Sequence, residues 1–231
     1  MLLGITQPTF MPWIGYFAFL NKIDKIILLD NVQYEKRSWH QRNNIKLNNN
    51  KHLLTVSVKS KGKFKQNISE TEIFYDKNTK LIKKKIYHAY SKSDYFKNYY
   101  SSICDILDEE YMYLSQLNTA LIKFFVDALN IKVDFDYSSR YSLDLKKEKL
   151  IFKLCEVNNC NEYITTIGSK NYLGSHKIIP NTNIKISYFE YRFIKYNQIG
   201  NNFISNLSIL DLLFNEGENS INVINNGFKL L

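Results

Sequence analysis

Short apolar runs alternate with longer stretches of helical spacing along this chain. Five of these runs are apolar or β-branched over four to six residues or so, which is typical of buried strands: residues 2–6, 25–30, 133–137, 162–167 and 184–189. Apolar residues also alternate with polar ones at 54, 56 and 58, so a further strand is expected at 52–58. We expect another short strand at 70–75, after a polar, glycine-containing loop at 59–67.

Apolar positions recur at helical spacing in most of the segments between these runs. The expected helices are 13–22, 78–91, 93–107, 110–129, 146–157, 208–214 and 220–224. Alternating strands and helices predict an α/β protein whose mostly parallel sheet is flanked by helices. The three consecutive central helices predict a helical insert or subdomain around residues 78–129.

No internal repeat, low-complexity linker or domain boundary is visible in the sequence. We therefore expect a single α/β domain over residues 1–231. Its parts are an N-terminal β-α-β region at 1–76, a helical region at 77–130 and a C-terminal α/β part at 131–231.

Polar residues gather where the first two predicted strands stop. Gln7 follows the first strand, and Asp30 ends the second. In an open α/β sheet, the loops at the carboxyl ends of the strands form the ligand crevice. The first 45 residues therefore predict half of a binding site.

The net charge of +9 has two interpretations. It is either a lysine-rich, solvated surface or an attraction for anionic partners, such as nucleotide phosphates or an acidic carrier protein. The densest cationic cluster is Lys80, Lys83, Lys84 and Lys85. No RNA- or DNA-binding motif accompanies the charge, so nucleic acid is not an expected partner.

Cysteine and histidine spacing gives no sign of a disulfide framework or a metal site. The three cysteines are an odd, sparse set, and the four histidines are scattered. The chain also lacks a signal-peptide pattern and any run of about 20 apolar residues long enough to span a bilayer. We therefore expect a cytoplasmic protein without a membrane span, a metal or a bound cofactor.

Asp30 is the strongest candidate for a catalytic residue. A carboxylate at the end of a buried strand can act as a general base when partial burial raises its pKa. The alternative is a fixed ion pair with Arg37 or Arg42, and the sequence leaves both open. His40 is a second candidate base.

Several polar and aromatic residues are candidates for substrate binding. Amide side chains, which both donate and accept hydrogen bonds, suit a sugar or an amide: Gln7, Gln33 and Asn43. Guanidinium groups suit phosphates, unless they belong to a solvated turn: Arg37 and Arg42. Aromatic residues line a pocket or simply pack in the core: Trp13, Tyr16 and Tyr90. A turn after the strand at 162–167 presents backbone N–H groups to an anion: Gly168, Ser169 and Tyr172.

The N-terminal motifs resemble those of the WbqC family. The resemblance lies in QPTFMPWIGYF at 7–17, DNVQY at 30–34 and RSWHQRN at 37–43, and continues in later segments at 163–173 and 208–217. It covers nearly the whole chain. The resemblance implies a role in O-antigen or other surface-polysaccharide biosynthesis, with transfer of an acyl or aminoacyl group to an amino sugar.

Taken with the candidate residues, the resemblance implies a lipopolysaccharide-pathway transferase acting on a nucleotide-linked amino sugar. Asp30, with His40, would deprotonate the attacking amine, while Arg37, Arg42 and Ser169 would hold phosphates or developing negative charge. A thioester donor would make an acyl carrier protein or coenzyme A the co-substrate. Two alternatives remain: a nucleotidyltransferase-like enzyme, whose paired histidines are absent, and a non-catalytic carbohydrate-binding or scaffold protein.

Overall fold

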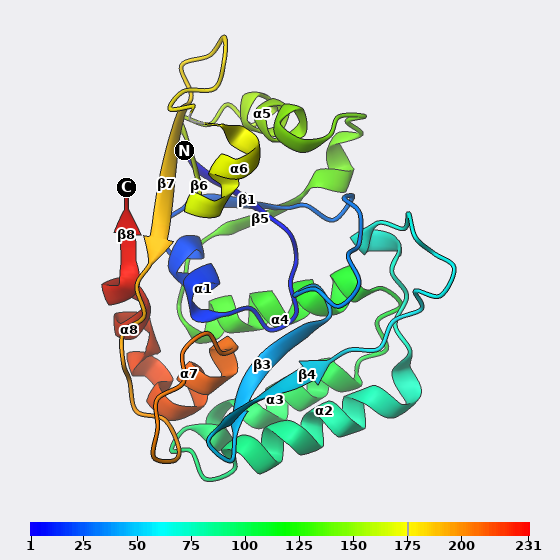
Figure 1. Ribbon diagram of the computed structural model, residues 1–231, viewed down its shortest axis with the longest axis vertical. Helices are drawn as coiled ribbons and strands as arrows, with labels where there is room; N and C mark the ends of the chain where they lie inside the picture. The colour runs from blue at the N-terminus through cyan, green and yellow to red at the C-terminus, as the bar shows by residue number, and fades with distance from the viewer. Residues whose placement is uncertain (175) are drawn as a thin grey trace.

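Six strands form one sheet in the computed structural model, which describes residues 1–174 and 176–231 but not the side chains of 75–78 and 172. The strands are β1 (Leu2–Thr6), β2 (Lys25–Leu28), β5 (Asp134–Tyr137), β6 (Glu162–Thr166), β7 (Lys185–Tyr191) and β8 (Phe228–Leu230). Their order is β5-β2-β1-β6-β7-β8, and only β8 runs antiparallel to its neighbour. The predicted α/β class with a mostly parallel sheet is confirmed (Figure 1).

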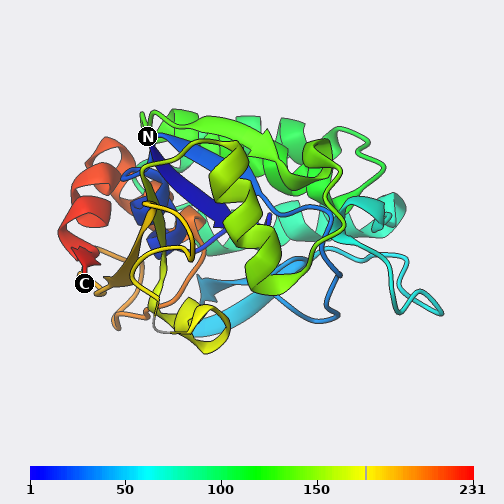
Figure 2. The ribbon, with the colours of Figure 1, turned by 90° about the horizontal axis from the view of Figure 1, so that it is seen from above.

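The order of the strands reverses at β1. The chain moves from β1 to β2 on one side and later returns to β6 on the other. Because such crossovers are right-handed, the connecting helices cover opposite faces of the sheet. Helix α1 (Ile14–Leu20) belongs to one hydrophobic core, and α5 (Lys147–Val157) belongs to the other. Seen from above, α5 and α6 (Lys170–Leu173) lie on one side of the sheet and α8 (Ser220–Gly227) on the other (Figure 2).

Burial on both faces explains why the central strands are apolar throughout. In β2, Ile26 and Leu28 face the core that contains α1, while Ile27 faces the core that contains α5. All three side chains are fully buried. Successive side chains of a strand point to opposite faces, so a strand covered on both sides needs apolar residues at every position.

The predicted helical region is present as three consecutive helices beside the sheet. These are α2 (Tyr75–Tyr90), α3 (Phe96–Asp108) and α4 (Leu114–Ala128). Figure 1 shows α2 and α3 at the lower edge of the molecule and α4 above them. Helix α7 (Ile209–Glu216) and the buried side chains of α4 join the same core as α1. Among the described residues, no helix combines the length and the apolar character needed to cross a membrane.

The region between β2 and α2 differs from the sequence-based expectation. An antiparallel hairpin joins β3 (Arg42–Leu47) to β4 (Asn50–Thr55), and β3 was not expected because its residues are mostly polar. Its two-residue turn, Asn48 and Asn49, has positive φ at both positions, as a type I′ turn requires. The strand expected at 70–75 is wrong. A 3₁₀ turn at Ile68–Glu70 is followed there only by isolated bridges.

Candidate functional site

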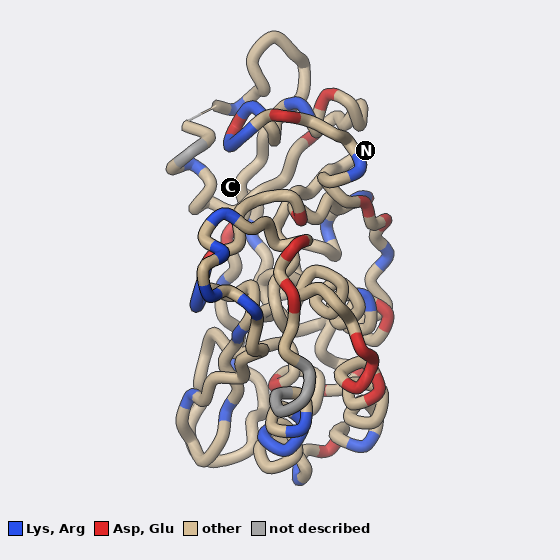
Figure 3. Tube along the Cα trace, turned by 90° about the vertical axis from the view of Figure 1, so that its right-hand side faces the viewer, with Lys and Arg blue, Asp and Glu red and all other residues tan. Residues whose placement is uncertain are grey.

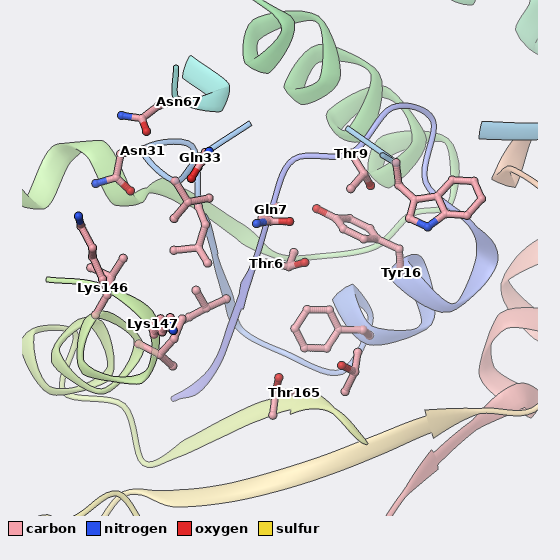
Figure 4. Close-up of a pocket in the computed structure, with 18 of the residues that line it drawn as sticks. Thr6, Gln7, Thr9, Tyr16, Asn31, Gln33, Asn67, Lys146, Lys147 and Thr165 are labelled. Atoms are coloured by element: carbon pink, nitrogen blue, oxygen red, sulfur yellow. The ribbon is translucent and has the colours of Figure 1, made fainter. Parts of the chain in front are cut away.

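A cavity of about 1570 Å³ opens at the carboxyl ends of the central strands, where the strand order reverses. Polar lining residues at these strand ends are Thr6, Gln7, Asn31, Thr165 and Thr166. Aromatic residues of the α1 side form one wall, and the start of α5 forms another. Open α/β sheets bind their ligands at this place, so the predicted crevice exists (Figure 4).

Gln7 stands at the centre of the cavity and is oriented by His40. The Oε1 atom of Gln7 lies 2.9 Å from Nε2 of the His40 ring. The other ring nitrogen, Nδ1, accepts a hydrogen bond of 3.4 Å from the backbone N–H of Glu35. The proton of the neutral ring therefore sits on Nε2 and is donated to Gln7. The NH₂ group of Gln7 has no hydrogen-bond partner among the described residues, so it can donate to a ligand.

Burial keeps His40 neutral. Only 3% of the residue is exposed, and this desolvation lowers its pKa, although the nearby Glu35 carboxylate partly offsets the effect. A neutral imidazole donates one hydrogen bond and accepts one, which matches its two partners. His40 therefore acts as a positioning residue for Gln7 in this structure and does not itself line the cavity.

Two buried amides hold the proline-bounded loop that carries Gln7. The Nδ2 atom of Asn118, on α4, donates to the carbonyl oxygens of Pro8 (3.0 Å) and His40 (2.8 Å). On β3, Nδ2 of Asn43 donates to the carbonyl oxygen of Met11 at 2.7 Å. Asn43 also lines the cavity, but its amide hydrogens serve the loop. Helix α4 and the hairpin thus fix one edge of the cavity.

The aromatic wall comes from α1 and the residue before it. Tyr16 is buried, lines the cavity, and its hydroxyl has no hydrogen-bond partner among the described residues. Burial raises the pKa of Tyr16, so the hydroxyl stays protonated, and Figure 4 shows it pointing toward Gln7. Trp13 packs edge-on against Tyr191 at 5.7 Å between ring centroids.

Asp30 lies outside the cavity. Its neighbours Leu29 and Asn31 line the cavity, whereas Asp30 borders a separate small depression. Its carboxylate accepts hydrogen bonds from the Ser139 backbone N–H (2.9 Å), the Ser139 hydroxyl (2.7 Å) and the Ser138 hydroxyl (3.0 Å). These bonds hold the start of a 3₁₀ turn at Ser138–Tyr141. The carboxylate is thus engaged by serines, and no ion pair with an arginine is found for it among the described residues.

The two arginines predicted to hold phosphate do not line the cavity. Arg37 is exposed in a tight turn with φ of 57°, and its backbone N–H donates to Gln41. Arg42 begins β3, with its charge near the buried Tyr34 hydroxyl. Gln33 does line the cavity, but its Nε2 donates to the carbonyl oxygen of Phe64 at 2.9 Å.

Tyr90 belongs to a buried network away from the cavity. Its hydroxyl donates to Oδ1 of Asp211 (3.0 Å) and accepts from the backbone N–H of Lys46 (3.1 Å). Tyr196 donates to the other carboxylate oxygen of Asp211 at 2.7 Å. Burial raises the pKa of Asp211 to about 6. This network joins α2, β3 and α7, and it explains the burial of Tyr90 without a ligand.

The end of β6 contributes two threonines to the cavity, whereas the turn after it contributes none of the predicted residues whose side chains are described. Thr165 and Thr166 line the cavity, whereas Gly168 and Ser169 do not. Ser169 is buried, and its hydroxyl donates to the carbonyl oxygen of Thr166 at 2.7 Å. The side chain of Tyr172 lies outside the described residues.

The sequence interpretation missed several lining residues: Thr6, Asn31, Asn67, Lys146 and Lys147. Asn31 and Thr6 stand at strand ends, so the rule that located Gln7 could have found them. Lys146 and Lys147 open α5, where no motif marked them. Within the described residues, no group of three or more His, Cys, Asp or Glu side chains is placed to hold a metal ion.

Comparison with known proteins agrees with the motifs. The model of the WbqC-like protein family matches residues 7–223. The chain is 32% identical over 216 residues to Uncharacterized protein Rv1507c of Mycobacterium tuberculosis, and the alignment covers 93% of each chain. No solved structure matches. The chain therefore belongs to the WbqC-like protein family.

Proposed function

We propose that the cavity binds a nucleotide-linked amino sugar and that the protein transfers an acyl or aminoacyl group to its amine. The observation that carries the proposal is the cavity at the strand-order reversal, with Gln7 at its centre. Its volume of about 1570 Å³ exceeds the roughly 300–1,000 Å³ of usual small-molecule sites. That volume suits an extended substrate together with part of a second one.

The reaction forms an amide from an amine and a thioester. The sugar nitrogen attacks the thioester carbonyl carbon, a C–N bond forms, the C–S bond breaks, and the amine proton leaves with the thiol. Negative charge develops on the carbonyl oxygen during the attack. Preorganised neutral donors stabilise such an oxygen. In this proposal the NH₂ group of Gln7 and the hydroxyl of Tyr16 are those donors, while His40 positions Gln7.

The proposed donor is a thioester of an acyl carrier protein or of coenzyme A, and the proposed setting is cytoplasmic assembly of O-antigen or another surface glycan. Membership of the WbqC-like family supports this setting through the resemblance described above. The positive net charge of the chain is compatible with an acidic carrier protein.

Mass spectrometry of reaction mixtures tests the proposal. Purified protein is incubated with nucleotide-linked amino sugars and with acyl or aminoacyl thioesters, and the sugar nucleotide is expected to gain the mass of the acyl group. Gln7→Glu keeps the length of the side chain and an oxygen acceptor for His40 but removes the NH₂ donor. It should therefore fold and lose most of the transfer. Full transfer by Gln7→Glu would contradict the proposal, as would pyrophosphate release from a nucleoside triphosphate in place of acyl transfer.

A second candidate function is non-catalytic binding of the same sugar within the assembly machinery. It is favoured by the observation that both predicted bases are engaged inside the protein, Asp30 by two serines and His40 by Gln7 and Glu35. This candidate is supported if calorimetry detects binding of a sugar nucleotide while none of the acyl or aminoacyl donors yields a product.

A further inference from the structure

We propose that the start of α5 forms the phosphate subsite of the cavity, with Lys146 and Lys147 as its cations. The group bound there is the diphosphate of the substrate. This inference rests on the proposed function, because it assigns the anionic part of that substrate. The lysines take the phosphate-binding role that the sequence predicted for Arg37 and Arg42, which lie outside the cavity.

Charge around the cavity is unbalanced. Four lysines line it (Lys51, Lys65, Lys146 and Lys147), and Asp144 is the single acid in the described lining. Within the described residues, none of these four ammonium groups takes part in an ion pair, whereas Lys25, Lys59 and Lys83 elsewhere do. Figure 3 shows Lys and Arg spread from one end of the molecule to the other with acids among them, so the net charge alone marks no such site.

The first turn of α5 carries residue types that are unusual at the start of a helix. The positive end of the helix dipole favours acidic or small polar residues, yet Lys146 is the N-cap residue and Lys147 follows it. The N-cap side chain makes no capping hydrogen bond, and among the described residues no side chain accepts from the first backbone N–H groups of the helix. Glu148 offsets part of this charge but does not line the cavity. An anion at this helix start would accept hydrogen bonds from the backbone N–H groups and neutralise the charge of the lysines.

The opposite wall offers uncharged donors instead of cations. Tyr16 is 7% exposed, lines the cavity and has an unpartnered hydroxyl. Figure 4 shows Lys146 and Lys147 on the α5 side, Tyr16 on the α1 side and Gln7 between them. A substrate that is anionic at one end and neutral but polar at the other fits this arrangement. The diphosphate would lie at α5 and the sugar at Gln7 and Tyr16.

Calorimetric titration with inorganic pyrophosphate, UDP and uridine tests the subsite, because pyrophosphate carries no base or sugar. The cavity double variant is Lys146→Gln with Lys147→Gln. The matched control is Lys149→Gln with Lys153→Gln, which removes the same charge from α5 at positions outside the cavity lining. We expect the cavity double variant to weaken pyrophosphate and UDP binding about tenfold or more, which is about 1.4 kcal/mol, with uridine binding unchanged. The control should shift all three affinities by less than about twofold.

Equal weakening by both double variants would overturn the inference, since a general field effect would then explain it. So would unchanged pyrophosphate affinity in the cavity double variant, or no pyrophosphate binding by the wild-type protein. The proposed function fails separately. If acyl transfer proceeds with a wild-type KM in the cavity double variant, only the subsite is wrong. If pyrophosphate binding depends on the lysines but no sugar nucleotide is bound or acylated, the subsite stands and the function is wrong.

Discussion

His40 gives Gln7 one fixed orientation, and this pairing makes the stability of the protein depend on pH. Burial lowers the pKa of His40 below its ordinary 6.5, so below that pH the unfolded chain takes up the proton first. The stability that the neutral ring contributes is complete above pH 6.5 and is lost as the pH falls through the lowered value.

We therefore expect the free energy of unfolding of the wild-type protein, measured relative to His40→Gln, to fall from pH 7 to pH 5. Urea denaturation of both proteins at several pH values measures the free energy of unfolding. Parallel curves for the two proteins would show that another group is responsible.

Asp30 is expected to matter for stability rather than for turnover. Asp30→Asn exchanges one carboxylate oxygen for an NH₂ group that faces the donors of Ser138 and Ser139. Loss of charge-assisted hydrogen bonds in a buried site costs about 1–3 kcal/mol. Chemical denaturation should show this loss, while ligand binding by the folded variant stays near the wild-type value. A variant of normal stability that has lost turnover would restore Asp30 as the base.

For single residues, the sequence predicted where the binding site lies better than it predicted what each residue does there. The strand-end rule placed Gln7 at the cavity, because side chains after parallel strands meet at one edge. It could not separate Asp30 from Asn31, because both follow β2 and only the fold shows which of the two side chains faces the cavity. The arginines were chosen for their chemistry, but only the folded chain brings Lys146 to the cavity.

At the scale of single elements, Gly15 sets how α1 meets the cavity. A Cβ atom at this position would collide with the Trp13 ring. Gly15→Ala should therefore displace the indole and lower the free energy of unfolding, although alanine favours a helix by about 1 kcal/mol. Gly168→Ala is the control, because a Cβ there meets nothing closer than 3.9 Å. Thermal unfolding and tryptophan fluorescence report both effects. A stabilised Gly15→Ala protein with unchanged emission would contradict the packing argument.

The Asp211 network links three elements and has the opposite pH dependence to His40. Burial raises the pKa of Asp211 from 3.8 to about 6. The contribution of the protonated carboxyl is complete below pH 3.8 and is lost as the pH rises through about 6. Relative to Asp211→Asn, the wild-type protein should thus gain stability between pH 6 and pH 4, on the order of 2 kcal/mol. Denaturation of both proteins over that range gives the difference, and a constant difference would exclude the raised pKa.

Strands and helices were predicted correctly where their burial requires a regular pattern of apolar residues. The strands at 2–6 and 162–167 and the amphipathic helices were found because apolar residues mark them. The hairpin β3–β4 was only half found, because one face of β3 is polar and even its buried positions include Asn43 and Lys46. The clue available in the sequence was the pair Asn48 and Asn49, since asparagine tolerates the positive φ that the structure shows in this turn.

For the whole molecule, the class of fold followed from alternation of strands and helices, but the order of the strands did not. That β1 lies between β2 and β6 depends on contacts distant in sequence. This order creates the reversal point and brings α1 and α5 to opposite walls of one cavity. The candidate site is thus a property of the complete sheet, although its central residue, Gln7, is visible in the first ten residues.

Protection from hydrogen exchange should follow the same architecture. Strands β1 and β2 pair on both edges and are buried on both faces, so their amides should exchange only when the whole molecule unfolds. In β4, five of the six residues are exposed, and its amides should exchange by local opening. Mass spectrometry of exchanged peptides measures this order. Saturating UDP should further slow exchange at Gln7, at Thr9 and in the first turn of α5, but not in β4. Equal protection of β4 and β1 would contradict the assignment of the sheet as the stable centre, because a hairpin outside the sheet has no reason to unfold with it.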